Sequence, residues 1–443
     1  MPTLDRNPES MDGRGRAPEL RQDVKSKVHA RLLETLDLSQ ARAMAPADLR
    51  DECARRLDDL ISEQRAPLTS KEKQQLLREV MDEIFGLGPL EEIMRDTEVT
   101  DILINGAHQI FIERSGALTE IDLGFRDDQH LMQVIQRIAA GVGRRIDESS
   151  PMLDARLHDG SRVNAIIPPL ALDGPAMSIR RFAGVKIDAG TLVGYESWAP
   201  EMATFLEAAV RCKMNVIVSG GTGTGKTTLL NVLSKWIPPG ERVITIEDAA
   251  ELMLQRDHVV ALETRPANVE GKGEVTQRDL LKNTLRMRPD RIILGEVRGG
   301  ETLDMLQAMN TGHEGSMSTV HANSPRDALR RIENMVSMSG LKYPVHVIRD
   351  QMASTLNLLV HSQRMTGGKR KVVNISEISG MEKDVVLLQD IFRFVQTGLN
   401  EGGHAVGYFE SCGVRPACLA RIQAEGVDVP VELFQKRRLM TTH

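Results

Sequence analysis

Aromatic residues are scarce in this sequence of 443 residues, in which phenylalanine, tryptophan and tyrosine together account for 3%. A surface that holds nucleic acid by stacking bases on aromatic side chains is therefore not expected. The formal net charge of −6 gives no general attraction to nucleic acid or anionic lipid, although a local basic patch is compatible with it. These features predict a protein that does not bind nucleic acid directly.

Cysteine and long apolar segments are also in short supply. The four cysteines, at positions 53, 212, 412 and 418, form no CxxC pair. This disfavours a zinc ribbon, and scattered thiols are typical of a cytoplasmic protein, which also disfavours the alternative of a Cys412–Cys418 disulfide. No apolar run approaches the ~18 residues of a transmembrane helix, and the amino-terminal segment lacks the apolar core of a signal peptide. We therefore expect a cytoplasmic protein without a transmembrane segment.

The overall composition is that of an ordinary globular protein, with 41% hydrophobic and 27% charged residues. At roughly 150 residues per domain, the length predicts about two or three domains. Residues 1–20, rich in Pro, Gly, Asp and Arg, are expected to form a disordered tail. Residues 21–85 have apolar residues at helical spacing, and the break before KEKQQLLREVMDEIF predicts Thr69 or Ser70 as a helix N-cap.

The pattern changes to short strands over residues 86–185. TDILING, QIFIER and ALTEIDL alternate apolar and polar residues, then a helix (DDQHLMQVIQRIAAGV) and three more strand-like pieces follow. This order predicts a small α+β domain. Residues 186–200 contain glycines and a proline and are expected to be a linker. Residues 381–443 are expected to be a C-terminal extension that adds a strand and a Gly-rich tail.

Strand and helix patterns alternate over residues 201–380. Apolar strands are expected at MNVIVS, RVITIE, RIILGEV and GSMSTVHA. Helices are expected from Lys226 onward and over residues 276–286, 301–310 and 324–336. This alternation predicts an α/β fold whose parallel sheet is covered by helices on both faces.

The segment NVIVSGGTGTGKTTLLN has the spacing GxxxxGK[ST] between an apolar strand and a helix. Small residues let the backbone turn its N–H groups toward phosphate oxygens, and the following helix adds the positive end of its dipole. Lys226 is expected to reach the β- and γ-phosphates of ATP, and the Thr227 hydroxyl to bind Mg²⁺. The strand–loop–helix context disfavours a chance Gly-rich turn. The predicted nucleotide-binding residues are Gly220, Gly221, Thr222, Gly223, Thr224, Gly225, Lys226, Thr227 and Thr228.

Two further strands end in acidic residues: Glu247 and Asp248 in RVITIEDAAEL, and Glu296 in RIILGEVRGGE. In a parallel sheet these ends share one edge with the phosphate loop. One acid can hold Mg²⁺, directly or through water, while another takes a proton from the attacking water. Which acid is the base stays open, as do helix capping for the first two and a surface position for the third. The predicted magnesium ligands, some through water, are Thr227, Glu247, Asp248 and Glu296.

The segment GHEGSMSTVHANS has His313 before a strand and His321 at its end. Two histidines eight residues apart do not have a spacing typical of metal sites, so a metal centre is not expected there. A structural role is the alternative for either histidine. The place of His321 at a strand end favours a role as a sensor of the γ-phosphate.

Four of these blocks together resemble the ATPases of type II and type IV secretion systems. GGTGTGKTT resembles their Walker A motif, TIEDAAEL their Asp box, RIILGEVRGGE a Walker B motif with Glu in place of Asp, and GHEGSMSTVHANS their His box. The resemblance continues upstream through GLGPLEEIM, PMLDARLHDGSRVNAIIPP and MSIRRF. The tight-adherence (Tad) pilus ATPases, CpaF-like proteins, look closest. The conjugation-type ATPases of type IV secretion and archaeal flagellar motors come next.

The resemblance implies a RecA-like ATPase domain that works as a ring, by analogy a hexamer. Such a motor powers pilus assembly or protein secretion from the cytoplasmic side of the inner membrane, and inner-membrane platform proteins are its implied partners. In the family, the upstream domain supplies arginines to the nucleotide. By position in their motifs, the implied catalytic residues are Glu296, Glu247, His321, Arg156, Arg162, Arg180 and Arg181. Ion pairs on a solvated face are the alternative for the arginines, and Arg298 is expected to hold loops or an interface together.

The sequence also departs from the family pattern, and two other functions compete with it. The chain lacks the paired CxxC motifs typical of the type II branch, and the tail after Met381 has no motif with an assignable chemistry. A small-molecule P-loop kinase needs an acceptor site and a lid, for which the sequence has no signal. A RecA-like nucleic-acid translocase is disfavoured by the acidic balance and the few aromatics.

Overall fold

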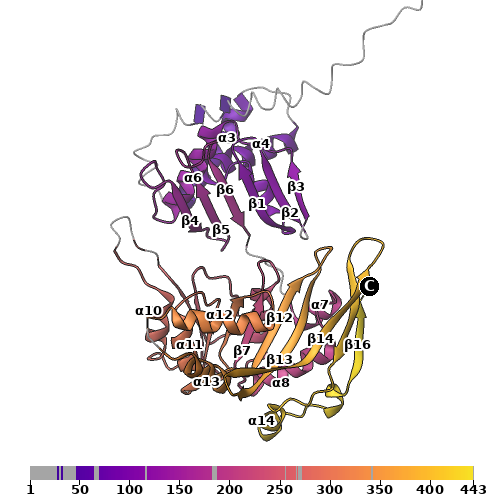
Figure 1. Cartoon of the computed structure of the whole chain (residues 1–443). Coiled ribbons are helices and arrows are strands. Elements are labelled where there is room, and N and C mark those ends of the chain that lie inside the picture. The colour runs from indigo at the N-terminus through magenta and orange to yellow at the C-terminus, as the bar shows by residue number, and fades with distance from the viewer. Residues whose placement is uncertain are drawn as a thin grey trace, which may run out of the picture. The chain divides into compact units, whose positions relative to one another are not determined.

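A computed structural model describes residues 27–28, 31–32, 46–63, 69–114, 117–181, 187–254, 256–265, 267, 272–340 and 343–442. The chain divides into two units, residues 1–184 and 185–443 (Figure 1). The tail expected over residues 1–20 lies outside the described residues. None of the described helices is long and apolar enough to cross a membrane.

The first unit contains the helices α3 (Pro46–Glu63) and α4 (Ser70–Phe85). α4 begins where the sequence predicts. The Thr69 hydroxyl accepts a hydrogen bond from the Glu72 N–H (3.3 Å), and the Glu72 carboxylate accepts one from the Thr69 N–H (2.7 Å). This capping box satisfies N–H groups that have no partner within the helix. Apolar side chains of both helices form one buried cluster.

A six-stranded antiparallel sheet follows in the first unit, in the order β3-β2-β1-β6-β5-β4. Strands β4, β5 and β6 alternate buried and more exposed residues, because one face of the sheet packs against α6. The predicted order of strands and helix is therefore present. The elements are α5 (Leu90–Arg95), β1 (Val99–Asn105), β2 (Ile110–Arg114), β3 (Ala117–Ile121), α6 (Asp128–Gly141), β4 (Met152–Arg156), β5 (Arg162–Ile166) and β6 (Ala176–Arg180).

A ten-stranded sheet runs through the second unit in the order β16-β15-β14-β13-β12-β7-β11-β10-β8-β9. The strands from β12 to β9 in this order are parallel, and β13 to β16 continue the sheet as an antiparallel meander. β7 and β8 are buried at every position, which explains their continuous apolar sequences. The strands are β7 (Val216–Gly220), β8 (Val243–Glu247), β9 (Val259–Glu263), β10 (Arg291–Leu294), β11 (Met317–His321), β12 (Leu358–Arg364), β13 (Arg370–Glu382), β14 (Val385–Leu399), β15 (Ala405–Ser411) and β16 (Arg437–Thr442).

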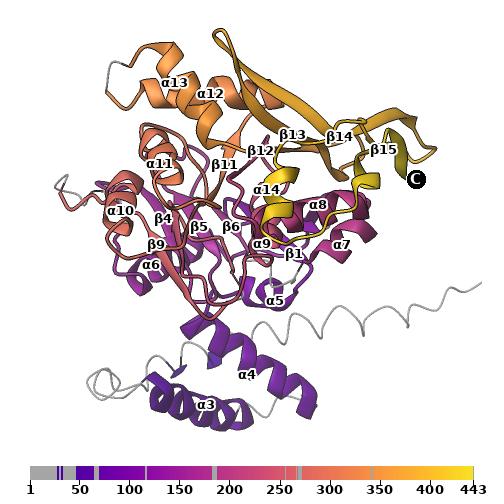
Figure 2. The ribbon, with the colours of Figure 1, turned by 90° about the horizontal axis from the view of Figure 1, so that it is seen from below.

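Helices cover both faces of the parallel strands (Figure 2). One buried cluster joins the sheet to α7, α8, α9 and α14, and a second joins its other face to α10, α11, α12 and α13. The predicted α/β fold with a parallel-rich sheet is confirmed. The helices are α7 (Ala189–Gly194), α8 (Pro200–Arg211), α9 (Lys226–Ser234), α10 (Gln277–Thr284), α11 (Glu301–Asn310), α12 (Pro325–Ser337), α13 (Val345–Thr355) and α14 (Leu419–Ala424), with the 3-10 turn η1 (Val431–Phe434).

Two expectations about connecting segments differ from the structure. The stretch 186–200, expected to be a linker, contains α7, which Asp188 caps by accepting a hydrogen bond from the Thr191 N–H (2.7 Å). Leu192 and Trp198 of the same stretch are buried in the core, so the segment is held in place by packing. The C-terminal extension, expected to add one strand, adds β14, β15 and β16, because β14 pairs with β13, β15 with β14 and β16 with β15.

Candidate functional site

The glycine-rich loop connects the carboxyl end of β7 to α9. Lys226, the first residue of α9, is 8% exposed, and its Nζ donates a hydrogen bond to the Gly221 carbonyl (2.8 Å). The amino end of α9 contributes the positive end of a helix dipole at the same place. A buried ammonium and a helix amino end beside one glycine-rich loop are the features that bind the phosphates of a nucleotide.

His321 lies beside this loop, at the carboxyl end of β11, where it is paired in register with Gly220 of β7. Its Nε2 is 3.3 Å from Nζ of Lys226 and 3.3 Å from Oε1 of Glu296. Glu296 follows β10, the next strand in the sheet. Three residues predicted from separate motifs therefore meet at one point on the sheet edge.

Arg298 extends this set of contacts to β8. One guanidinium nitrogen, Nη2, is 3.0 Å from Oε2 of Glu296, and the other, Nη1, is 3.4 Å from Oδ2 of Asp248. The guanidinium thus bridges the loops that follow β8 and β10. This geometry agrees with the expectation that Arg298 holds loops together.

Glu247 accepts hydrogen bonds from the loop that follows β8. It is 4% exposed, and its Oε1 accepts hydrogen bonds from the N–H groups of Glu251 (2.9 Å) and Leu252 (3.0 Å). A Cβ at Gly295 would be 2.7 Å from Cγ of Glu247, so a larger residue at this position would displace the glutamate side chain. The two predicted strand-end glutamates therefore have different partners. Glu247 accepts hydrogen bonds from the loop after β8, and Glu296 contacts His321.

The charges of the site perturb one another. Burial lowers the pKa of Lys226 below its ordinary value, and the Glu296 carboxylate opposes the shift. Burial is also the main cause that lowers the pKa of His321, and the Lys226 ammonium lowers it further. A lowered pKa keeps the imidazole neutral at pH 7, so Nε2 acts either as a donor or as an acceptor of a hydrogen bond. Nε2 can accept from the Lys226 ammonium or donate to the Glu296 carboxylate.

Comparison with known proteins identifies the family. Residues 83–385 match the family described as "Type II/IV secretion system protein", and residues 21–85 match "Type II secretion system protein E, N-terminal domain". The chain belongs to the type II/IV secretion system protein family.

Three related proteins match between 62 and 72% of this chain. A Mycobacterium tuberculosis protein named "Putative conjugal transfer protein MT3759" is 35% identical over 339 residues, which are 72% of this chain and 96% of the relative. The conjugal transfer protein TrbB of Rhizobium radiobacter is 33% identical over 64% of this chain and 85% of its own length. The type IV secretion system protein VirB11 of Brucella abortus is 32% identical over 62% of this chain and 84% of its own.

Solved structures of related proteins match as well. The VirB11 ATPase of the Brucella suis type IV secretion system is 29% identical and covers 66% of this chain and 97% of its own, with a TM-score of 0.36. The pilus retraction motor PilT is 18% identical and covers 77% and 86%, with a TM-score of 0.48. Membership of the family makes this chain a nucleotide-binding ATPase.

Mg²⁺ is the metal that the chemistry of this ATPase family implies. Within the described ranges, no group of three or more His, Cys, Asp or Glu side chains is placed to hold a metal ion. Mg²⁺ in nucleotide sites takes one or two protein oxygens and completes its shell with phosphates and water. Thr227, on the first turn of α9, is the oxygen donor that fits best, because Glu296 and Asp248 both contact Arg298 and Glu247 accepts hydrogen bonds from a loop.

The other histidine of the secretion ATPase motif, His313, lies at the opposite end of β11. It precedes the strand, and its carbonyl accepts a hydrogen bond from the Ser316 hydroxyl (2.7 Å). Residues before and after a strand lie on opposite edges of the sheet. His313 is therefore away from the phosphate loop, and the structural role named as its alternative agrees with its position.

Arg156, Arg162 and Arg180 form a row in the first unit. They lie directly opposite one another on the neighbouring strands β4, β5 and β6. Side chains that are directly opposite point to the same face of a sheet. The family resemblance assigned these residues separately, and the register now places them side by side.

Acidic partners hold two of these arginines. Nη2 of Arg162 is 2.7 Å from Oδ2 of Asp154, and Nε of Arg180 is 3.2 Å from Oδ1 of Asp101. Arg181, which follows β6, donates a hydrogen bond to the Asp96 carbonyl. The ion pairs named as the alternative are thus present, and any role at a nucleotide requires them to open.

Sequence analysis missed a contact made to the phosphate loop from β13. Nε of Arg370 donates a hydrogen bond to the Gly223 carbonyl (2.8 Å). Its neighbours Lys369 and Lys371 have their Nζ atoms 2.9 and 3.8 Å from Oε2 of Glu196. The segment GGKRK resembles any charged hairpin turn, so its sequence carried no signal for this contact.

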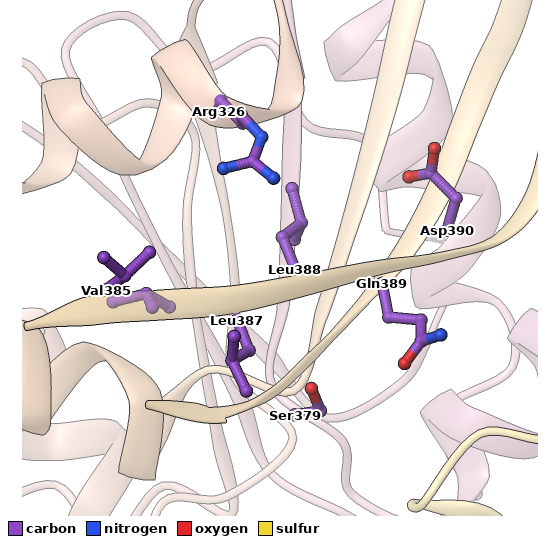
Figure 3. A pocket seen from close by; sticks show the side chains of 8 residues that line it. Arg326, Ser379, Val385, Leu387, Leu388, Gln389 and Asp390 are labelled. Atoms are coloured by element: carbon purple, nitrogen blue, oxygen red, sulfur yellow. The ribbon is translucent and has the colours of Figure 1, made fainter. Parts of the chain in front are cut away.

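A groove between α12 and β14 lies outside this site (Figure 3). Its volume is about 390 Å³. The lining residues are Arg326, Ser379, Val385, Val386, Leu387, Leu388, Gln389 and Asp390. None of them belongs to the phosphate loop or to the histidines and acids described above.

Proposed function

We propose that this chain is the ATP-hydrolysing motor of a type IV secretion machine of the conjugation type. The relatives at 32 to 35% identity bear the names of conjugal transfer and VirB11 proteins. These names favour the conjugation-type alternative over the Tad pilus that the sequence resemblance placed first. A pilus assembly motor of CpaF type is the second candidate, supported by the motif resemblance.

The contacts of His321 with Lys226 and Glu296 carry the proposal for the hydrolytic site. Lys226 binds the β- and γ-phosphates, and the neutral His321 senses the γ-phosphate beside it. Glu296 orients the attacking water and takes its proton. Bound Mg²⁺, held by Thr227, neutralises charge that develops on the phosphates.

The proposed motor is a homo-oligomeric ring, a hexamer by family resemblance, at the cytoplasmic face of the inner membrane. Inner-membrane platform proteins connect it to the membrane. Arg156, Arg162 and Arg180 reach the nucleotide of a neighbouring subunit, for which the ion pairs of Arg162 and Arg180 must open. An arginine at the γ-phosphate is worth about 10³–10⁵ in rate. Since the arginines and the phosphate loop are in different units, this step couples hydrolysis to movement.

Three measurements test the proposed motor. The ATPase rate per subunit should fall on dilution as the ring dissociates, and a constant rate would overturn the action of arginines between subunits. Phosphate should be released without any phosphorylated product, which excludes a kinase. DNA and RNA should leave the rate unchanged, which excludes a nucleic-acid translocase.

Neighbouring genes distinguish the two machines. Conjugation or type IV secretion genes beside this gene are expected. Genes for a pilin, a prepilin peptidase and paired inner-membrane platform proteins would instead support the pilus assembly motor and overturn the conjugation-type proposal.

A further inference from the structure

A buried histidine lies beneath the phosphate loop and belongs to none of the family motifs described above. His361, on β12, is 3% exposed, and its Nδ1 is 2.8 Å from Oγ of Ser219, which is fully buried on β7. The two residues are directly paired in the register of these parallel strands. Since neither side chain is accessible, the pair does not serve as a nucleophile and base for a bound substrate.

The serine end of this pair adjoins the start of the phosphate loop. Ser219 immediately precedes Gly220, where a Cβ would lie 2.5 Å from the Ser362 carbonyl and 2.5 Å from Oγ1 of Thr224. The hydroxyl of Ser362 is also 3.1 Å from Oγ1 of Thr224. Ser362 of β12 therefore packs against the first turn of the phosphate loop.

The other end of the imidazole reaches the turn that follows His321. Burial lowers the pKa of His361, and a hydrogen bond to the backbone of Asn323 and the charge of Asp327 oppose the shift. The ring is therefore neutral at pH 7. We take the backbone partner at Asn323 to be its carbonyl, which requires N–H at Nε2 of the ring; Nδ1 is then the acceptor, and the Ser219 hydroxyl donates to it.

The same turn touches the phosphate loop through its backbone. The Ala322 N–H donates a hydrogen bond to the Gly220 carbonyl (3.3 Å). The Asn323 N–H donates one to Oδ2 of Asp327 (3.1 Å). The turn is thus hydrogen-bonded on one side to the phosphate loop and on the other to the first turn of α12. The His361 imidazole connects this turn to Ser219 of β7.

We propose that His361 is a positioning residue for ATP hydrolysis. By bridging Ser219 and the turn at Asn323, it sets the place of His321 relative to the phosphate loop. The inference rests on the proposed hydrolytic site of Lys226, His321 and Glu296. His361 contacts neither the nucleotide nor the attacking water in this proposal. It acts on His321 through the turn at Asn323.

The test is a double-mutant cycle in the full-length chain, with kcat for ATP and the dissociation constant for ADP measured for each variant. Ser219→Ala should lower kcat about tenfold, because it leaves a buried acceptor without its donor. His361→Phe, which keeps the ring shape, should lower kcat at least as much. Adding Ser219→Ala to His361→Phe should cause no further loss, since the bond is already absent. ADP affinity should stay within about threefold throughout.

Ser318→Ala is the matched control, because Ser318 is a fully buried strand serine of β11 outside these contacts. It should leave kcat unchanged. If His361→Phe does not fold, His361→Gln takes its place in the cycle, and its kcat should fall about as far as that of Ser219→Ala, because it lacks the Nδ1 acceptor.

The outcomes separate this inference from the proposed hydrolytic site. A kcat of Ser219→Ala close to wild type, losses that add, or equal losses of kcat and ADP affinity would each overturn the positioning role. If Lys226→Ala still hydrolyses ATP, the hydrolytic site itself is wrong. If Lys226→Ala loses hydrolysis and Ser219→Ala hydrolyses normally, the positioning role of His361 is refuted and the hydrolytic site is retained.

Discussion

Nε2 of His321 lies 3.3 Å from Oε1 of Glu296. Because the burial of the histidine lowers its pKa, this contact joins a neutral imidazole to a carboxylate rather than two opposite charges. The carboxylate also accepts a hydrogen bond from Arg298 (3.0 Å). Glu296 is therefore held in one orientation from two sides, as a base that must meet a water molecule requires.

Replacing this carboxylate should separate binding from turnover. Glu296→Gln keeps the size of the side chain but removes its basicity, so kcat should fall by about 10²–10⁴. Binding of ATP with Mg²⁺ should stay close to wild type, measured by titration calorimetry. If tight binding is lost together with turnover, Glu296 holds the metal and is not the base.

Glu247→Gln should produce a different change. Its Oε1 accepts two backbone N–H groups, and an amide oxygen can accept them less strongly than a carboxylate. The free energy of unfolding should fall by about 1–3 kcal/mol, measured by denaturant titration, with kcat falling less than in Glu296→Gln. A variant of wild-type stability without turnover would instead make Glu247 the base.

The pH profile should report His321. Its pKa is lowered by burial and by Lys226, so the neutral ring persists below pH 6.5, the ordinary value. The acid limb of kcat against pH should therefore lie below pH 6.5 and should change in His321→Gln, which cannot be protonated. An acid limb that is identical in the variant assigns the titration to another group.

Lys226→Ala should abolish hydrolysis and weaken nucleotide binding, because it removes the buried ammonium beside the loop. The measurement is ATPase rate and ADP affinity. Lys235→Ala is the matched control: Lys235 follows α9, and its Nζ donates to the Ile187 carbonyl (3.0 Å). The control should keep both properties, and equal losses in the two variants would contradict a specific role for Lys226.

Stability should depend on pH through Lys371. Its buried ammonium lies 4.9 Å from the centre of the Phe394 ring, and burial lowers its pKa from 10.5 to about 8. Between these values the unfolded chain binds more protons. The stabilising contribution is therefore present above pH 10.5 and lost as the pH falls through about 8.

Lys371→Met should remove this dependence. Across the same pH window, the unfolding free energy of wild type should rise relative to the variant by about 1 kcal/mol per pH unit. Denaturant titrations at several pH values measure the difference. Parallel curves for the two proteins would show that Lys371 keeps its ordinary pKa.

Much of the fold was predictable because local patterns and tertiary packing agree. The continuous apolar runs of β7 and β8 are buried at every position, and the capping box of Thr69 and Glu72 starts α4 where the sequence indicates. The strand β9 was not predicted. It is half exposed at the sheet edge and lacks the continuous burial of β7 and β8, so pairing with β8 decides its structure.

The site was predictable for similar reasons, up to a limit. Parallel strands bring their carboxyl ends to one edge, which is why His321 and Glu296 could be expected near the phosphate loop. The burial of Glu247 depends on two N–H groups of the following loop, and the contact of Arg370 depends on a strand 147 residues away from Gly223. Motif spacing contains no information about such contacts.

The tight fit of Gly295 against Glu247 has a consequence for the evolution of this family. A side chain at position 295 would displace Cγ of Glu247, which is 2.7 Å from the place of its Cβ. Homologues that have alanine or a larger residue at this position should therefore have, at position 247, a residue without a γ atom or a side chain turned away from position 295. Gly295 and Glu247 should therefore change together among homologues rather than independently.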